Sequence, residues 1–258
     1  MDLEIAVTSA TGARISREGG ANRVELCSGL ELGGLTPSNG LVTAVVEEGI
    51  DTHVLIRPRP GDFHYSADDV AQSCLEIASL GKIGISGIVI GALNQYGAVD
   101  IPSIRRLVDT AHSVDETMEI TFHRAVDLAP DPANIVEELM PLGFTRVLTS
   151  GKSNRAVDGI PVIKELANTV GGRIQIMAGG GIRAQDIHPL LAEGRADAVH
   201  LSAKKLFEPG ATGDVSLGSA AENPGSYYVT NERVVRDASL AVKQASTHSE
   251  NSSPSALD

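Results

Sequence analysis

The chain has few cysteines, few basic residues relative to acidic ones, and no long apolar run. Two cysteines in 258 residues cannot build a disulfide framework, which favours a reducing compartment. Lysine and arginine number 21 against 33 acidic residues, and this net charge of −12 argues against a surface for nucleic acid or for an acidic membrane leaflet. No apolar stretch reaches membrane-spanning length, and the first residues carry no basic secretory region. We therefore expect a cytoplasmic protein without nucleic-acid or membrane partners.

Several common catalytic motifs are also missing. The sequence has no G-x-S-x-G elbow, no dinucleotide-binding fingerprint, no C-x-x-C pair, and no methionine-rich or histidine-rich tract. The first apolar run reads Glu4-Ile5-Ala6, where the first strand of a metal-hydrolase barrel usually has His-x-His. These absences argue against a serine hydrolase, a dinucleotide-dependent enzyme and a metal hydrolase.

Eight short apolar runs are present, and most are separated by stretches with helical periodicity such as Ile101–Ser113, Ala133–Leu142 and Ile160–Val170. Strand and helix alternating eight times over about 250 residues predict a single (β/α)8 TIM barrel, an α/β fold with a parallel eight-stranded sheet. The runs are Leu3–Ser9, Arg23–Ser28, Thr52–Arg59, Gly87–Leu93, Glu119–Ala125, Arg146–Gly151, Arg173–Gly179 and Ala198–Ala203.

We assign residues 1–245 to this barrel domain. Within it, residues 206–230 are rich in Gly, Ala, Ser and Pro and are predicted to form an irregular insertion. Residues 231–245 have helical spacing with Asn231 as a candidate cap, and we expect them to close the barrel. Residues 246–258 are rich in serine and are expected to form a disordered tail.

Polar side chains occupy one alternating face of several runs. Because side chains alternate across a strand, one parity must point into the barrel, where a purely structural barrel would have Val, Ile and Leu. The polar or charged set therefore indicates a site. It comprises Glu4, Glu25, Cys27, Arg57, Arg59, Thr121, His123, Thr149, Gln175, His200 and Ser202.

Four of these residues, or their neighbours, are candidate catalytic residues. His123 is placed for acid–base work near neutral pH, and Glu25 could orient it or take a proton itself. Arg57 and Arg124 are expected to bind anionic groups. The alternative is structural, because a carboxylate beside an arginine can be a satisfied buried ion pair.

The loops after the sixth, seventh and eighth runs predict an anion-binding site. In this fold the loops after strands seven and eight commonly hold phosphate near a helix N-terminus, and glycine lets a ligand approach the backbone. Alternatively, the glycines serve only a tight turn. The predicted anion-binding residues are Thr149, Ser150, Gly179, Gly180, Gly181 and Ser202.

Six segments together resemble the signature of the CutC family, in order from about Leu3 to Ala203. They are Glu25–Cys27 with Gly33–Ser38, Ile56–Arg59 with Gly61–Phe63, Phe122–Ala125 with Asp127, Leu148–Gly151, Ala178–Gly181 and His200–Ala203. The resemblance implies a TIM barrel, a cytoplasmic location, and a role in copper homeostasis with copper binding.

The residues offer few ligands for such a metal. Cu(I) prefers thiolate and thioether ligands and Cu(II) accepts imidazole, so Cys27 and His200 are the candidate metal ligands. A buried free cysteine is more often a core residue, and this alternative stays open for Cys27.

Two hypotheses follow: copper homeostasis with copper as ligand, and an enzyme acting by His/Glu acid–base chemistry on a small anionic or phosphorylated substrate. A third, a barrel serving only as an interaction scaffold, is disfavoured by the charged interior. A homodimer is compatible with the sequence, although no apolar stripe marks its interface.

Overall fold

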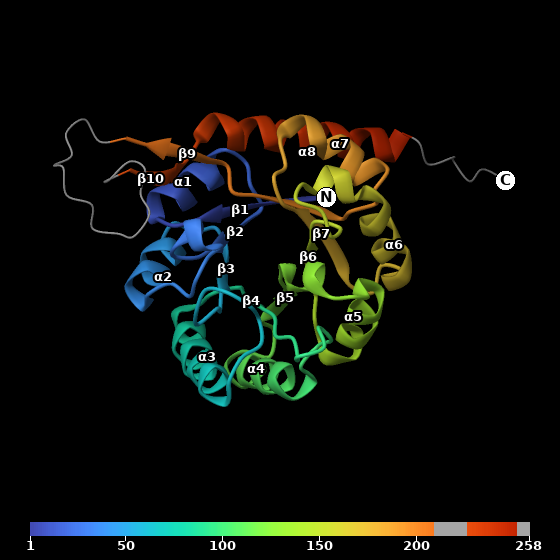
Figure 1. The fold of residues 1–258 in the computed structure, drawn as a ribbon. Helices are drawn as coiled ribbons and strands as arrows, with labels where there is room; N and C mark the ends of the chain where they lie inside the picture. The colour runs from blue at the N-terminus through green and yellow to red at the C-terminus, as the bar shows by residue number, and fades with distance from the viewer. Residues whose placement is uncertain (209–225, 252–258) are drawn as a thin grey trace.

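Eight parallel strands close into a barrel in the computed structural model, which describes residues 1–208 and 226–251 and side chains up to residue 247. Each strand pairs with the next along the chain, and β8 returns to β1, so the predicted (β/α)8 barrel is confirmed (Figure 1). The strands are β1 (Asp2–Val7), β2 (Arg23–Leu26), β3 (Asp51–Leu55), β4 (Gly87–Ile90), β5 (Glu119–Phe122), β6 (Arg146–Thr149), β7 (Gln175–Gly179) and β8 (Ala198–Leu201).

Helices surround the barrel, as the ring in Figure 1 shows. They are α1 (Ala10–Glu18), α2 (Asn39–Val46), α3 (Ala67–Leu80), α4 (Ile101–Val114), α5 (Pro132–Leu139), α6 (Ile160–Val170), α7 (Ala184–Ala192) and α8 (Glu232–Asn251). Short 3-10 helices are η1 (Leu30–Leu32), η2 (Gly81–Ile83), η3 (Arg124–Leu128), η4 (Met140–Leu142) and η5 (Ala156–Gly159). The apolar core lies between the helices and the outer side of the strands, which is why the strands are almost continuously apolar.

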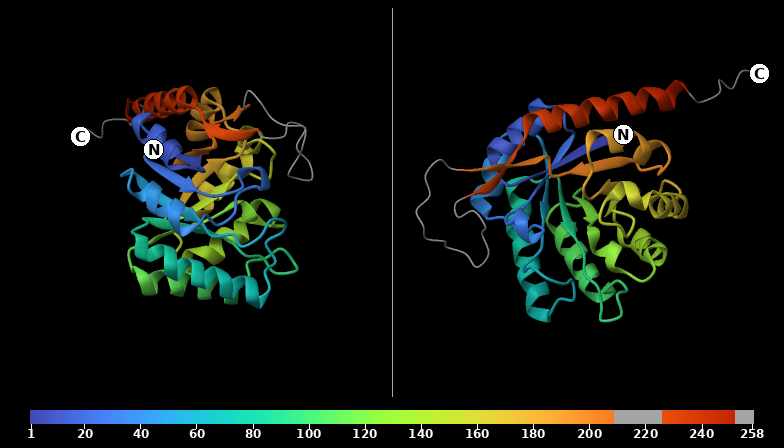
Figure 2. Two further views of the ribbon diagram at one scale, coloured as in Figure 1. Left: turned by 90° about the vertical axis from the view of Figure 1, so that its left-hand side faces the viewer. Right: turned by 45° about the horizontal axis from the view of Figure 1, so that its top comes forward.

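The C-terminal region differs from its prediction. Lys204–Phe207 and Tyr227–Thr230 form strands β9 and β10 of an antiparallel pair, so the two ends of the predicted insertion are regular (Figure 2). The rest of it, residues 209–225, lies outside the described residues. The closing helix α8 is present, and Asn231 accepts a hydrogen bond from the backbone N–H of Arg233.

Helix α8 continues to Asn251, so the predicted tail is wrong for residues 246–251, while residues 252–258 lie outside the described part. Serine is only a moderately poor helix former, and an established helix extends easily through such residues. Within the described ranges, no helix has the length and apolarity needed to cross a bilayer.

The barrel interior is unusually polar. Arg146, on β6, donates hydrogen bonds to Thr121 (3.2 Å), Gln175 (2.9 Å) and Glu119 (3.0 Å). The inward side chains of β6 are therefore Arg146 and Leu148, and the predicted inward position of Thr149 is wrong. The buried charge of Arg146 is stabilised by partners on β5 and β7, and these partners are not evident from the sequence of β6 alone.

Candidate functional site

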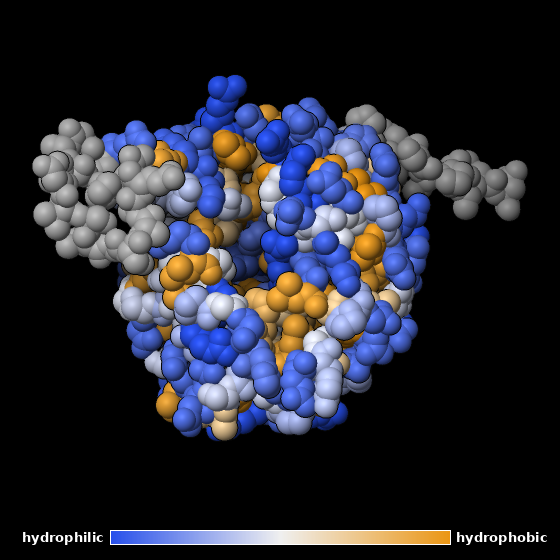
Figure 3. All heavy atoms as spheres, viewed as in Figure 1, coloured by the Kyte–Doolittle hydropathy of each residue, from blue (hydrophilic) through white to orange (hydrophobic). Residues whose placement is uncertain are grey.

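The interior opens into a cavity of about 280 Å³ where the strands end. The face shown in Figure 3 is hollowed near its centre, with polar and apolar residues around the rim. The cavity brings together many of the predicted site residues, and it also includes apolar ones such as Leu55, Phe63 and Ile182. The predicted residues that line it are Glu25, Cys27, Arg57, His123, Arg124, Gly180, Gly181, His200 and Ser202.

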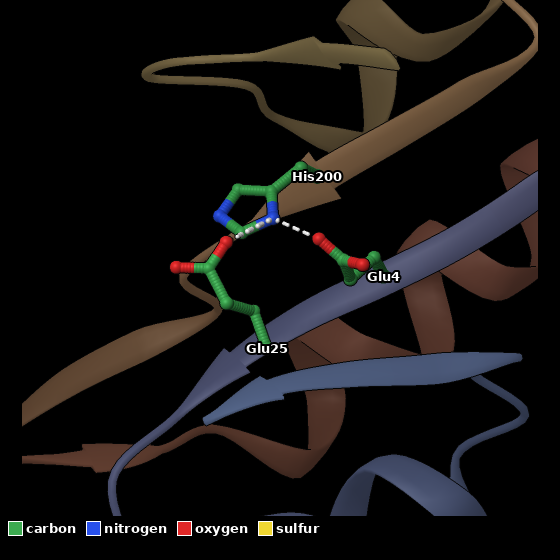
Figure 4. Close-up of side chains that lie close together, drawn as sticks. All are labelled: Glu4, Glu25 and His200. Atoms are coloured by element: carbon green, nitrogen blue, oxygen red, sulfur yellow. Dashed lines mark hydrogen bonds and ion pairs between the residues drawn. The ribbon is translucent and has the colours of Figure 1, made fainter. Parts of the chain in front are cut away.

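His200, on β8, meets two carboxylates at one ring nitrogen (Figure 4). Its Nδ1 lies 2.7 Å from Glu4 Oε1 and 3.7 Å from Glu25 Oε2. Glu4 comes from β1, which pairs with β8, and Glu25 comes from β2, which pairs with the other edge of β1. Glu4 is fully buried, and its second oxygen accepts a hydrogen bond from Arg23. Closure of the sheet therefore assembles one group from the two ends of the chain.

The pKa values of the two glutamates shift in opposite directions, although both face the same nitrogen of His200. Burial would raise the pKa of Glu4, but the hydrogen bond from His200 and the charge of Arg23 outweigh it and hold that pKa below its ordinary value. Burial raises the pKa of Glu25 to about 7, and the charge of Glu4 adds to this. Burial alone would lower the pKa of His200, but the two carboxylates raise that pKa by more, so its net shift is upward. Glu4 is thus ionised, while Glu25 titrates near neutral pH.

Arg23 and His53 are interior residues that the sequence reading missed. Arg23 shares the parity of Glu25, and that spacing was a usable signal. His53 shares the parity of Arg57; its Nε2 lies 3.5 Å from Glu119, and burial lowers its pKa to about 3. Neither lines the cavity, and each precedes a lining residue of the same parity, Glu25 on β2 or Arg57 just beyond β3.

Arg57, just beyond β3, is 6% exposed and holds the loops around the cavity. Its guanidinium donates to the carbonyls of Leu32 (2.9 Å), Gly34 (2.8 Å) and Gly61 (2.8 Å). Its Nε is buried without a hydrogen-bond partner among the described residues. The guanidinium plane also lies over the ring of Phe63, 5.2 Å from the centroid.

His123, just beyond β5, is held as a neutral ring. Its Nδ1 accepts a hydrogen bond from the backbone N–H of Ala125 (3.2 Å), which places the ring proton on Nε2. Burial lowers the pKa of His123 to about 3, and the charge of Arg57 adds to this. This geometry does not favour the predicted acid–base role, because the ring would accept a proton only in strong acid. A donor role through Nε2–H fits better.

Arg124, Thr149 and Ser150 converge on Asp127 instead of the cavity centre. The carboxylate of Asp127 accepts from Arg124 Nε (2.9 Å), Thr149 Oγ1 (2.6 Å) and both the backbone N–H and the hydroxyl of Ser150. Arg124 also donates to Ser150 Oγ (2.7 Å). Thr149 and Ser150 do not line the cavity, and their donors already serve a carboxylate of the chain itself.

Both glycines of the turn after β7 have a positive φ, a region that favours glycine. Gly180 and Gly181 have φ of 124° and 60°, and both line the cavity with Ser202. Gly179 packs against Leu148 and His200 instead. The helix that follows, α7, has the Asp186 carboxylate at its N-terminus, where it accepts from the backbone N–H of Arg183. The chain after β8 enters the β9–β10 pair.

Cys27 is not part of the candidate metal cluster. Among the described residues, one group of three or more His, Cys, Asp or Glu side chains brings its ligand atoms within 4.8 Å of one another, and it consists of Glu4, Glu25 and His200. Cys27 is 1% exposed and packs with Leu55 and Val89, and burial raises the pKa of its thiol to about 12. Of the two predicted metal ligands, His200 belongs to this cluster and Cys27 does not, although both line the cavity.

Comparison with known proteins agrees with the fold and with the sequence motifs. The model of the CutC family matches residues 1–205. A CutC family protein of Xanthomonas campestris pv. campestris (strain 8004) is 42% identical over 205 residues, covering 79% of this chain and 84% of the relative. A CutC family protein of Histophilus somni (strain 2336) is 37% identical over 247 residues, covering 95% of this chain and 98% of the relative. The crystal structure of a putative copper homeostasis protein CutC from Streptococcus agalactiae has a TM-score of 0.72 at 30% identity. The match covers 78% of this chain and 99% of that structure's chain. The chain belongs to the CutC family.

Proposed function

We propose that this CutC-family barrel is an enzyme that binds a small anionic molecule in its cavity and moves a proton to or from it with Glu25. The observation that carries the proposal is the pair of Glu25 and His200 on the cavity wall, since Glu25 titrates near pH 7. A carboxyl group that titrates near the working pH is suited to general acid–base catalysis.

The neighbours of Glu25 have separate roles in this proposal. His200 Nδ1 lies 2.7 Å from Glu4 and also faces Glu25. In this way His200 positions Glu25 and stabilises its carboxylate when Glu25 has lost its proton. Arg23 holds Glu4 ionised beneath it. Arg57, buried on the cavity wall, supplies the positive charge for the anionic group of the ligand.

Hydrogen–deuterium exchange tests this function. Small 2-oxo acids and sugar phosphates would be incubated with the protein in D2O, and loss of their carbon-bound protons followed by NMR. We expect Glu25→Gln to slow the exchange by roughly a hundredfold or more. Glu31→Gln, a change of the same chemistry at an exposed position, is the control. Equal exchange by the Glu25→Gln protein and the wild type would refute the proposal.

Copper handling is the second candidate function. It is supported by the name of the Streptococcus agalactiae structure and by the cluster of Glu4, Glu25 and His200. The donor chemistry does not fit Cu(I), which prefers thiolate and thioether sulfur. The thiol of Cys27 is buried and protonated, and the Met177 sulfur lies 3.8 Å from the Arg23 guanidinium. Imidazole and carboxylate donors suit Cu(II), although both oxygens of Glu4 already have partners.

Anaerobic copper titration with a competing chelator separates the two functions. Wild type, Cys27→Ser and His200→Asn would each be titrated with Cu(I), and then with Cu(II) in air. Tight stoichiometric binding of Cu(I) that Cys27→Ser abolishes would favour copper handling through the thiol. Binding of Cu(II) alone, lost in His200→Asn, would assign the metal to the glutamate–histidine cluster.

We also propose a cytoplasmic location. The free thiols of Cys27 and Cys74 support it, because a reducing compartment keeps such cysteines unpaired. Fractionation with antibody detection would test this location.

A further inference from the structure

Arg57 is a buried cation without a carboxylate partner in the part of the chain that the structure describes. The other strongly buried interior arginines, Arg23 and Arg146, each pair with a glutamate. Arg57 meets backbone carbonyls instead, which satisfy N–H groups but carry no full negative charge. Burying an unpaired charge is costly, so this wall of the cavity favours an anion.

Two N–H groups on this wall have no hydrogen-bond acceptor among the described residues. They are Nε of Arg57 and Nε2 of His123, and both side chains are more than nine-tenths buried. The ring of Phe63 packs against both, with its centroid 4.5 Å from that of His123. A buried donor without a partner destabilises the folded state, and a ligand that accepts from both donors would remove that cost.

Phosphate is disfavoured by what surrounds the cavity. The donors of Thr149 and Ser150 are taken by Asp127, and the Asp186 carboxylate occupies the backbone N–H of Arg183 at the start of α7. Two N–H donors beside one positive charge match the two oxygens of a planar carboxylate. The cavity of about 280 Å³ is at the small end for ligand sites, which fits a small carboxylic acid.

We infer that Arg57 and His123 form a carboxylate-binding pair, and that the substrate class is small carboxylic acids. In this arrangement His123 is a neutral hydrogen-bond donor and Arg57 supplies the charge. The Phe63 ring packs against both members of the pair. This inference rests on the proposed function, since it names the substrate class of the same cavity.

Binding measurements with single histidine variants test the pair. Acetate, pyruvate and malonate would each be titrated into 15N-labelled protein and followed by NMR, with inorganic phosphate in parallel. We expect at least one carboxylate to bind saturably with a Kd below about 50 mM. Its affinity should fall tenfold to hundredfold in His123→Leu. His123→Gln presents an N–H donor at a similar position, so it should stay within a few fold of the wild type.

Two outcomes would overturn the inference. One is phosphate binding in the cavity while none of the three carboxylates binds. The other is unchanged carboxylate affinity in a folded His123→Leu protein. The Glu25→Gln variant separates this inference from the proposed function, because it should lose proton exchange and keep its affinity for the carboxylate. Should proton exchange persist in Glu25→Gln while His123→Leu loses affinity, the binding pair stands and the catalytic proposal fails.

Discussion

Gly87 on β4 and Gly91 just after it make room for His53 on β3 and for His123 just beyond β5. A Cβ on Gly91 would lie 2.4 Å from Cε1 of His123, and one on Gly87 would lie 2.7 Å from Cε1 of His53. Such distances are far inside van der Waals contact, so any larger residue would displace the ring. The bare backbone is therefore what allows imidazole rings inside the barrel.

The first prediction concerns Gly91→Ala. We expect it to lower the free energy of unfolding by about 1–3 kcal/mol, because the methyl group pushes His123 from its place. Gly40→Ala is the matched control, since a Cβ there meets nothing within 4 Å. It lies in the first turn of α2 and should leave stability unchanged or raise it by up to about 1 kcal/mol. Urea denaturation measures both, and equal effects would contradict the expected clash.

A second prediction concerns the pH dependence of stability at Glu25. Its pKa in the folded protein is about 7, against 4.5 ordinarily, so between these values the folded chain holds a proton that the unfolded chain has lost. The free energy of unfolding should therefore fall as pH rises from 4.5 to 7, by on the order of 3 kcal/mol relative to Glu25→Gln. Denaturation of both proteins across this range measures it. Parallel pH curves would show that Glu25 has no raised pKa.

At the scale of elements, α8 covers β1, α1 and α7 with one apolar face. Val235, Ala238 and Val242 are buried on this face, whereas Leu240 is 57% exposed. A Cβ on Gly19 would lie only 2.5 Å from Cγ1 of Val235, so the helix approaches the end of α1 closely. The hydroxyl of Ser239, on α8, also donates to the carbonyl of Gly20, just after α1 (3.1 Å).

The third prediction compares two truncations on this helix. Val235→Ala should cost about 2 kcal/mol, because two buried methyl groups are lost from a packed contact. Leu240→Ala should change stability by no more than about 0.5 kcal/mol, since that side chain is largely in water. Thermal and chemical denaturation would measure both changes. A larger effect at Leu240 would mean that another surface covers that side chain.

At the scale of the whole molecule, the strands of the barrel end well before α8, the last helix that packs against them. The family match stops at residue 205, just after β8, while α8 begins at Glu232. The outer side of β1 and the buried face of α1 need α8 to shield them from water. A closed sheet satisfies its backbone hydrogen bonds, but it is stable only if both faces are covered.

The fourth prediction is that a chain shortened to residues 1–205 does not unfold cooperatively. Without α8, the apolar surfaces of β1, α1 and α7 are exposed, which should produce binding of a hydrophobic dye and a broad thermal transition. The full chain measured in parallel is the reference. A sharp transition within a few degrees of the full chain would show that the barrel is stable without α8.

The amino-acid pattern was enough to predict the barrel and much of its site. Periods of two and 3.6 residues are local properties, so α6 at Ile160–Val170 could be read from the sequence. The same alternation placed Glu25, His123 and His200 inside before any contact was known. It failed for Thr149 on β6, where the inward residue is an arginine.

Partners across strands were decided only by the tertiary structure. Glu4 and His200 are 196 residues apart, and they meet because closure sets β8 beside β1. The roles of His123 and His200 depend on their surroundings in the fold: burial and the charge of Arg57 leave His123 neutral, while two carboxylates raise the pKa of His200. Composition and spacing predict most of the side chains that face inward, whereas burial and neighbouring charges determine their protonation, and both of these arise only when the chain folds.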